Sequence, residues 1–136
     1  MSDIVVDTSA AFAILTSELG SEDLVEALVG AEERAISAGT AIELGIVLEA
    51  RIGPAAPAII ERFLRDAGVD MVAVEREHVD RALEGWRRFG RGRHRAALNM
   101  GDLYAYGLAV SLGRPVLCTG SDFALTDVPV VGAEPG

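Results

Sequence analysis

The stretch IVVDTSA, residues 4–10, decides the fold class of this chain. Three β-branched residues at 4–6 predict a short buried strand, and the Ala-rich segment at 10–15 predicts a helix. Asp7 lies between the two. An aspartate here is a favoured helix N-cap, because its oxygen accepts from the unpaired N–H groups of the first turn. It can equally be a functional acid, and both interpretations stay open at this point.

Length and composition indicate one compact domain over residues 1–136. Half of the 136 residues are apolar, which is enough for a single core. The longest uncharged run, 103–113, is too short to cross a bilayer, and the start of the chain lacks the basic residues of a secretion signal. We therefore expect a soluble, cytoplasmic protein with no membrane association. The single Cys118 lies in an apolar run and is expected to be a buried hydrophobe.

After the first strand and helix, predicted helices alternate with predicted strands. Further strands are expected at 34–39, 69–74, 115–120 and 128–132, and helices at 20–30, 40–52, around 57–64, 76–90 and 101–113. In the helix at 40–52, the residues expected to face the core are Ile42, Ile46, Val47 and Ala50. This alternation predicts an α/β fold with a mostly parallel sheet of about five strands. Active sites in such sheets lie at the carboxyl ends of the strands.

The absence of lysine excludes several enzyme classes. All 12 basic residues are arginine. A P-loop, a phosphorylated receiver domain and the common restriction-type nuclease motif each need a lysine beside their acids or phosphates. Haloacid dehalogenase phosphatases need a second aspartate at the position that Ser9 occupies. The net charge of −9 also argues against general coating of nucleic acid.

Four carboxylates fall at predicted strand ends or helix starts on the same edge of the sheet: Asp7, Glu43, Asp102 and Asp122. Each has a structural alternative, since Thr40 and Glu43 have capping-box spacing, Asp102 suits a helix start and Asp122 suits a turn. Together they would repel one another unless a cation lay among them. Acidic oxygen ligands favour Mg²⁺ or Mn²⁺, which activate water for attack on phosphorus. The acids therefore predict phosphodiester hydrolysis.

Half of the arginines lie between residues 81 and 95. The densest stretch is RRFGRGRHR, residues 87–95. One interpretation is a solvated loop, or a helix end where cations suit the dipole. The other is a local phosphate-binding patch on an acidic protein. The candidate phosphate-binding residues are Arg87, Arg88, Arg91, Arg93 and Arg95.

Four segments carry a resemblance to a known family: VVDTSA, TAIELGIVLEAR, WRRFGRGRHRAALNMGDLYAYGLA and LCTGSDF. They resemble the PIN-domain ribonucleases, specifically the VapC toxins of type II toxin–antitoxin pairs. The resemblance implies a three-layer sandwich, a Mg²⁺- or Mn²⁺-dependent endoribonuclease, a homodimer, and a cognate VapB-type antitoxin that covers the active-site groove. It assigns metal binding to Asp7 and Asp102 and a third carboxylate to Glu43.

The fourth acid departs from the family pattern. Related chains usually carry Asp or Asn where this chain has Ser121, next to Asp122. Either Asp122 supplies the charge, or Ser121 orients a water and the site has three carboxylates. Two rival functions also stay open: a catalytically silent PIN-like module that binds a protein partner, and a structure-specific DNA nuclease.

Overall fold

The central element is a five-stranded sheet in which every pairing is parallel, in the order β3-β2-β1-β4-β5. The computed structural model describes residues 3–132. The strands are β1 (Ile4–Val6), β2 (Arg34–Ser37), β3 (Val69–Val72), β4 (Val116–Leu117) and β5 (Val130–Val131). The predicted parallel sheet of about five strands is confirmed. The first strand of the chain is its middle strand, so the end of β1 lies at the centre of the carboxyl edge.

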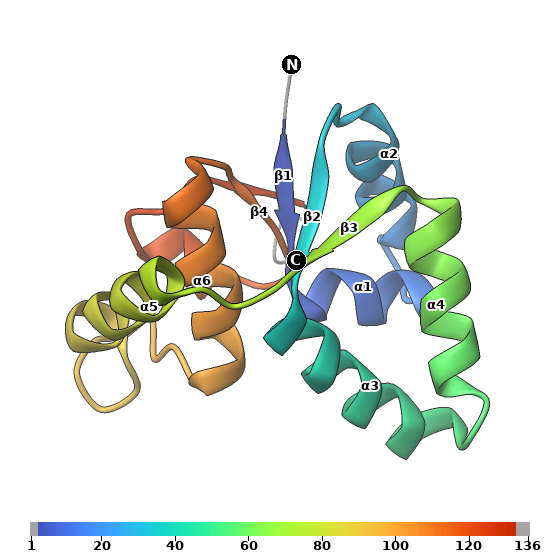
Figure 1. Cartoon of the computed structure of the whole chain (residues 1–136), viewed down its shortest axis with the longest axis horizontal. Coiled ribbons are helices and arrows are strands. Elements are labelled where there is room, and N and C mark those ends of the chain that lie inside the picture. Colours follow the sequence, from blue (N-terminus) through green and yellow to red (C-terminus); the bar gives the residue numbers. More distant parts are fainter. Residues whose placement is uncertain (1–2, 133–136) are drawn as a thin grey trace.

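Helices cover both faces of this sheet. They are α1 (Thr8–Leu15), α2 (Ser21–Gly30), α3 (Ala38–Ile52), α4 (Ala56–Asp66), α5 (Arg76–Phe89) and α6 (Met100–Leu112), with a short 3₁₀ turn η1 (Phe123–Leu125). Figure 1 shows α5 and α6 on one side of the strands and α1 to α4 on the other. The result is the expected three-layer sandwich. Between residues 3 and 132, no helix is both long and apolar enough for a membrane span.

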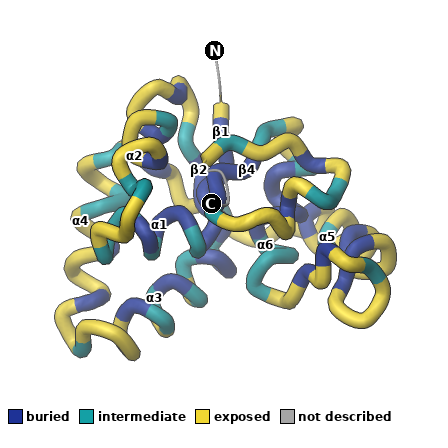
Figure 2. Tube along the Cα trace, turned by 180° about the vertical axis from the view of Figure 1, so that it is seen from behind, coloured by how far each residue is buried: buried dark blue, intermediate teal, exposed yellow. Residues whose placement is uncertain are grey.

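Alternating strand residues supply two separate cores. Ile4 and Val6 pack with buried residues of α1 to α4, whereas Val5 packs with buried residues of α5 and α6. This follows from the period of two in a strand, which sends neighbouring side chains to opposite faces. Figure 2 shows the strands as the buried centre and exposed positions along the outer sides of the helices. A central strand buried on both faces explains the uninterrupted IVV run.

The predicted orientation and start of α3 were wrong. The helix begins at Ala38 and its N-cap is Ser37, so the Thr40 to Glu43 spacing is not a capping box. Ile42 and Ile46 are each 65% exposed, and the buried side chains are instead Leu44 and Leu48. Both pairs have i, i+4 spacing on a largely apolar helix. Periodicity alone therefore could not choose the face, and packing against the sheet decided it.

Candidate active site at the carboxyl edge of the sheet

Three of the four predicted acids line one small pocket of about 320 Å³. Asp7 directly follows β1, Glu43 lies in the second turn of α3, and Asp102 lies in the first turn of α6. The remaining lining residues come from α1 and α3 and are Thr8, Ser9, Phe12 and Val47. Parallel strands bring the starts of successive helices to one edge, so acids far apart in sequence meet there.

A larger pocket of about 680 Å³ lies between α5 and α6. It is lined mainly by apolar side chains, including Val79, Leu83, Trp86 and Leu103, and by no carboxylate. Such a surface offers burial but no carboxylate to hold a hard cation. The acidic pocket is therefore the candidate for hydrolytic chemistry, although it is the smaller of the two.

Asp7 is both a helix cap and a member of the acidic pocket. Its Oδ2 accepts from the Ser9 backbone N–H at 3.0 Å and from the Ser9 hydroxyl at 2.7 Å. The capping interpretation is therefore right, but it uses only one carboxylate oxygen. Among the described residues nothing donates to Oδ1, which is available to a ligand. The N-cap role and a metal-binding role are compatible.

Burial raises the pKa of Asp7 from 3.8 to about 6. The side chain is only 4% exposed. The two hydrogen bonds from Ser9 oppose the shift, and the nearby charges of Asp102 and Glu43 add to it. A carboxyl group shifted in this direction has lost hydration through burial, and no cation among the described residues compensates for that loss.

The Ser9 hydroxyl also fixes the pocket to the neighbouring strand. While it donates to Asp7, its oxygen accepts from the Thr119 backbone N–H at 3.0 Å, just beyond β4. The orientation of the Asp7 carboxylate is thus tied to two adjacent strands. Sequence reasoning did not assign Ser9 this role. The sequence feature that could have indicated this role is a hydroxyl residue two positions after the acid at the end of a strand.

Glu43 and Asp102, like Asp7, are each held by hydrogen bonding to one carboxylate oxygen. The Thr8 hydroxyl donates to Glu43 Oε1 at 2.6 Å. The Asn99 backbone N–H donates to Asp102 Oδ2 at 3.0 Å, while Asn99 Oδ1 accepts from the Asp102 N–H at 2.9 Å. This capping box could have been found in the sequence from the Asn-Met-Gly-Asp spacing at 99–102. Each acid keeps a second oxygen for other interactions.

The pKa of Asp102 is raised, mainly by burial, with further contributions from the charges of Asp122 and Glu43. The backbone hydrogen bond from Asn99 opposes this. Two acids of one pocket therefore titrate above their ordinary range for the same reasons. The group that would relieve them is a cation.

The donor set of the pocket fits a hard divalent cation. Three carboxylates from separate elements surround it, and the chain has no lysine that could neutralise them internally. In residues 3–132, no group of three or more His, Cys, Asp or Glu side chains lies close enough together to hold a metal ion without rearrangement. Binding one ion with several of these acids therefore requires carboxylates to turn about their side-chain bonds.

The fourth predicted acid lies outside the lining of this pocket. Asp122 and Ser121 are exposed in the turn before η1. The negative charge of Asp122 contributes to the raised pKa of Asp102. The charges that contribute to the raised pKa of Asp7 are those of Asp102 and Glu43. Asp122 is thus on the Asp102 side of the acidic edge. Its role, and that of Ser121, stay predictions.

The arginine segment forms the end of α5 and the loop 90–99. Arg88 forms an ion pair with Asp127 at 3.0 Å, and Asp127 also accepts from the Tyr106 hydroxyl. The Arg93 guanidinium lies 4.2 Å from the centre of the Trp86 ring. These two arginines have structural contacts. The other three candidates, Arg87, Arg91 and Arg95, are exposed and form no ion pair within the described part of the chain.

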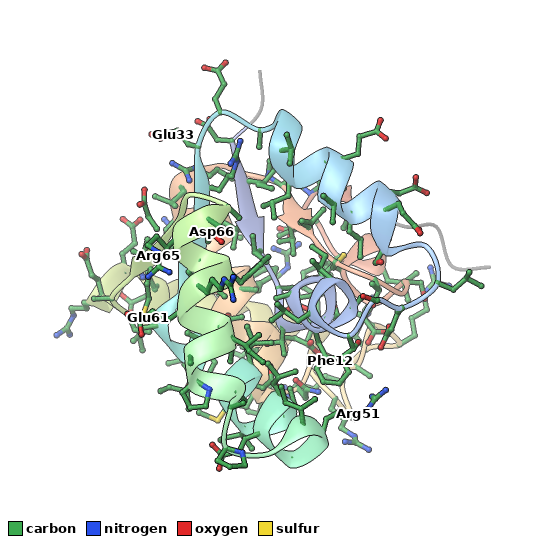
Figure 3. The ribbon with its side chains drawn as sticks, turned by 90° about the vertical axis from the view of Figure 1, so that its right-hand side faces the viewer. Phe12, Glu33, Arg51, Glu61, Arg65 and Asp66 are labelled. Atoms are coloured by element: carbon green, nitrogen blue, oxygen red, sulfur yellow. The ribbon has the colours of Figure 1, made fainter. Side chains whose placement is uncertain are left out.

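One arginine near the pocket was missed. Phe12 lines the pocket, and the Arg51 guanidinium lies 5.7 Å from the centre of its ring. Both side chains are labelled in Figure 3. The signal in the sequence was the i+4 spacing of Glu43, Val47 and Arg51 along α3. A cation therefore lies next to a side chain of the acidic pocket.

The chain is similar to known proteins in both sequence and fold. The PIN-domain pattern matches residues 4–129. A ribonuclease VapC of Mycolicibacterium smegmatis is 42% identical over 94% of this chain and 99% of its own, and ribonuclease VapC30 of Mycobacterium tuberculosis is 40% identical over 94% and 98%. Among solved structures, the sarcin-ricin loop cleaving toxin VapC20 of M. tuberculosis superposes with a TM-score of 0.76 at 18% identity, covering 96% of this chain and 100% of that one. DNA-bound VapBC of Salmonella typhimurium gives 0.72 at 17%, covering 96% and 98%.

Proposed function

Because this chain belongs to the PIN-domain family, and within it to the VapC ribonucleases, we propose that it is a metal-dependent endoribonuclease and the toxin of a toxin–antitoxin pair. One observation carries the proposal. Three carboxylates from α3, α6 and the end of β1 share a pocket, and burial and mutual repulsion raise the pKa values of Asp7 and Asp102. Phosphodiester hydrolysis is the reaction that this arrangement supports best.

In this mechanism Asp7, Glu43 and Asp102 would hold Mg²⁺ or Mn²⁺. When bound, the ion supplies positive charge to the scissile phosphate and lowers the pKa of an attacking water. Ser9, Thr8 and the Asn99 N–H keep one oxygen of each acid fixed. Above about pH 6 Asp7 is ionised and able to bind the ion. Asp122, or Ser121 through a water, is the proposed fourth contributor.

The proposed partners follow from the family. One structural neighbour is a toxin–antitoxin complex from Klebsiella pneumoniae, and another is DNA-bound VapBC from Salmonella typhimurium. We propose that a VapB-type antitoxin covers the acidic pocket of this chain. We further propose that residues 1–136 act as one domain, that the chain forms a homodimer, and that it acts in the cytoplasm, where its RNA substrate is present.

The test of the proposed function is a cleavage assay with purified protein. Structured RNA and flap-containing DNA are each incubated with Mn²⁺ or with EDTA. The proposal predicts RNA cleavage with Mn²⁺, its loss in EDTA, and no cleavage of DNA. DNA cleavage would instead support the structure-specific DNA nuclease. No cleavage of either substrate by antitoxin-free, folded protein would support the silent binding module.

The arginine segment gives a separate prediction about RNA binding. Replacing Arg91, Arg93 and Arg95 together with alanine should weaken RNA affinity. It should also reduce the slope of log affinity against log salt by about 0.7 for each lost phosphate contact. The control is an Arg62→Ala, Arg65→Ala variant on α4, where both arginines lie near Asp66. Titration of labelled RNA at several salt concentrations measures both. An unchanged slope in the triple variant would show that the loop makes no phosphate contact.

A further inference from the structure

We propose that Gly101 and Thr8 are positioning residues that together hold the Glu43 carboxylate in the acidic pocket. The inference rests on the proposed function, because it concerns the same three acids. Thr8 belongs to α1, Glu43 to α3 and Gly101 to α6. Glu43 is therefore located by contacts with two helices other than its own.

The contact with α6 depends on the missing side chain of Gly101. A Cβ atom at this position would overlap both oxygens and the Cδ atom of Glu43. Gly101 lies in the first turn of α6 and does not have a positive φ, so its backbone would accept any L residue. What distinguishes glycine here is space. The place that an alanine methyl group would take is occupied by the carboxylate.

The contact with α1 is a short hydrogen bond. The Thr8 hydroxyl donates to Glu43 Oε1 at 2.6 Å, and Thr8 itself is buried. Its hydroxyl therefore has little freedom to choose another partner. With Thr8 bound to Oε1 and the missing side chain of Gly101 leaving room for the carboxylate, Glu43 is kept in the acidic pocket with Asp102.

A second glycine lies at another close contact between α3 and α6. A Cβ atom on Gly39, in the first turn of α3, would overlap the ring of Tyr104 on α6. Glycines on both helices therefore let the elements that carry Glu43 and Asp102 approach each other. Gly101 is the one of the two that contacts an acid.

A substitution at Gly101 should change the position of the Glu43 carboxylate without lowering the stability of the fold. The atoms that an alanine at 101 would displace are the end of a flexible side chain, which can rotate away at little cost to the fold. Alanine is also the better helix former. Gly101→Ala should therefore leave the metal-free melting temperature unchanged or higher, while it moves Glu43 out of place. A residue with only a structural role would behave in the opposite way.

The first test compares Gly101→Ala with Gly45→Ala. Gly45 lies on α3, and a methyl group added there would have no neighbour within 4 Å, so it is a matched control. Affinity for Mn²⁺ is measured from its effect on the melting temperature, and RNA cleavage is measured in parallel. Gly101→Ala should weaken Mn²⁺ binding and cleavage by roughly 10- to 100-fold, as loss of support for a metal ligand usually does. Gly45→Ala should match the parent in both.

The second test asks whether the effect passes through Glu43. Glu43→Asp shortens the side chain by one methylene and makes room for a methyl group at 101. The fold-loss caused by Gly101→Ala should therefore be smaller in a Glu43→Asp background than in the parent. Thr8→Val should also weaken Mn²⁺ binding, and Thr8→Ser, which keeps the hydroxyl, should restore most of it.

The outcomes distinguish this inference from the proposed function. A parent protein that neither responds to Mn²⁺ nor cleaves RNA would overturn both. A parent that does so, with Gly101→Ala and Thr8→Val equally active, would overturn the positioning role alone. Losses from Gly101→Ala that are the same in the Glu43→Asp background would also overturn it, because the effect would then not depend on the length of Glu43.

Discussion

Asp102→Asn should abolish ribonuclease activity while the protein stays folded. Asp102 is half-buried in the first turn of α6, and its charge acts on the same pocket as Asp7 and Glu43. Asparagine keeps the shape and can still accept from the Asn99 N–H, so the capping box is preserved. Only the charge that attracts a cation is lost. We expect cleavage to fall by roughly 1,000-fold or more, which corresponds to about 4 kcal/mol of transition-state stabilisation.

Cleavage of structured RNA with Mn²⁺ measures this effect, and growth after induction in cells measures its consequence. The control is Asp66→Asn, which removes one exposed carboxylate from α4 and should leave cleavage unchanged. Circular dichroism and thermal melts establish that both variants are folded. A folded Asp102→Asn protein that cuts RNA at the parental rate would show that Asp102 is a helix-capping residue only.

Asp7→Asn should stabilise the metal-free protein at pH 7.5. The pKa of Asp7 is about 6 in the folded chain and 3.8 without the influence of the fold. A raised pKa means that the folded state binds the proton more tightly, so the ionised carboxylate opposes folding at neutral pH. A difference of about 2 pKa units corresponds to at most about 3 kcal/mol in the free energy of unfolding. Asparagine removes this cost and caps the helix equally well.

The pH dependence follows with a definite sign. As pH falls through 6 toward 4, Asp7 becomes protonated in the folded state before it does so in the unfolded state. The parent then regains stability relative to Asp7→Asn. The advantage of the variant should therefore be largest above pH 7 and should vanish near pH 4. Urea unfolding of both proteins in EDTA at several pH values measures it.

Mn²⁺ should remove most of the advantage of Asp7→Asn over the parent. At pH 7.5 the parent should gain roughly 2.7 kcal/mol when the free ion reaches about 100 times its dissociation constant. Asp7→Asn should gain much less, and the gain of the parent should shrink below pH 6 as protons compete for the carboxylate. Equal responses of both proteins to Mn²⁺ would place the ion elsewhere. No response of either would leave Asp7 as a cap alone.

The local sequence was sufficient for the fold class and for the edge of the sheet where the chemistry lies. The IVV run predicted a short buried strand, and the position of Asp7 immediately after it predicted an acid at the carboxyl edge. These features depend on residues within a few positions of one another. Period-two alternation, β-branched residues and capping signals act over such distances, which is why a linear pattern reveals them.

Only the tertiary structure decided which face of α3 is buried and how each acid is held. Leu44 and Leu48 are buried instead of Ile42 and Ile46, because the sheet and the neighbouring helices select among equally spaced apolar residues. Glu43 meets Thr8, 35 positions earlier, and Gly101 on another helix. Such contacts form when elements pack at a particular distance and angle. No short stretch of sequence encodes that distance. The pocket therefore exists only in the folded chain, where the end of β1, α3 and α6 lie together.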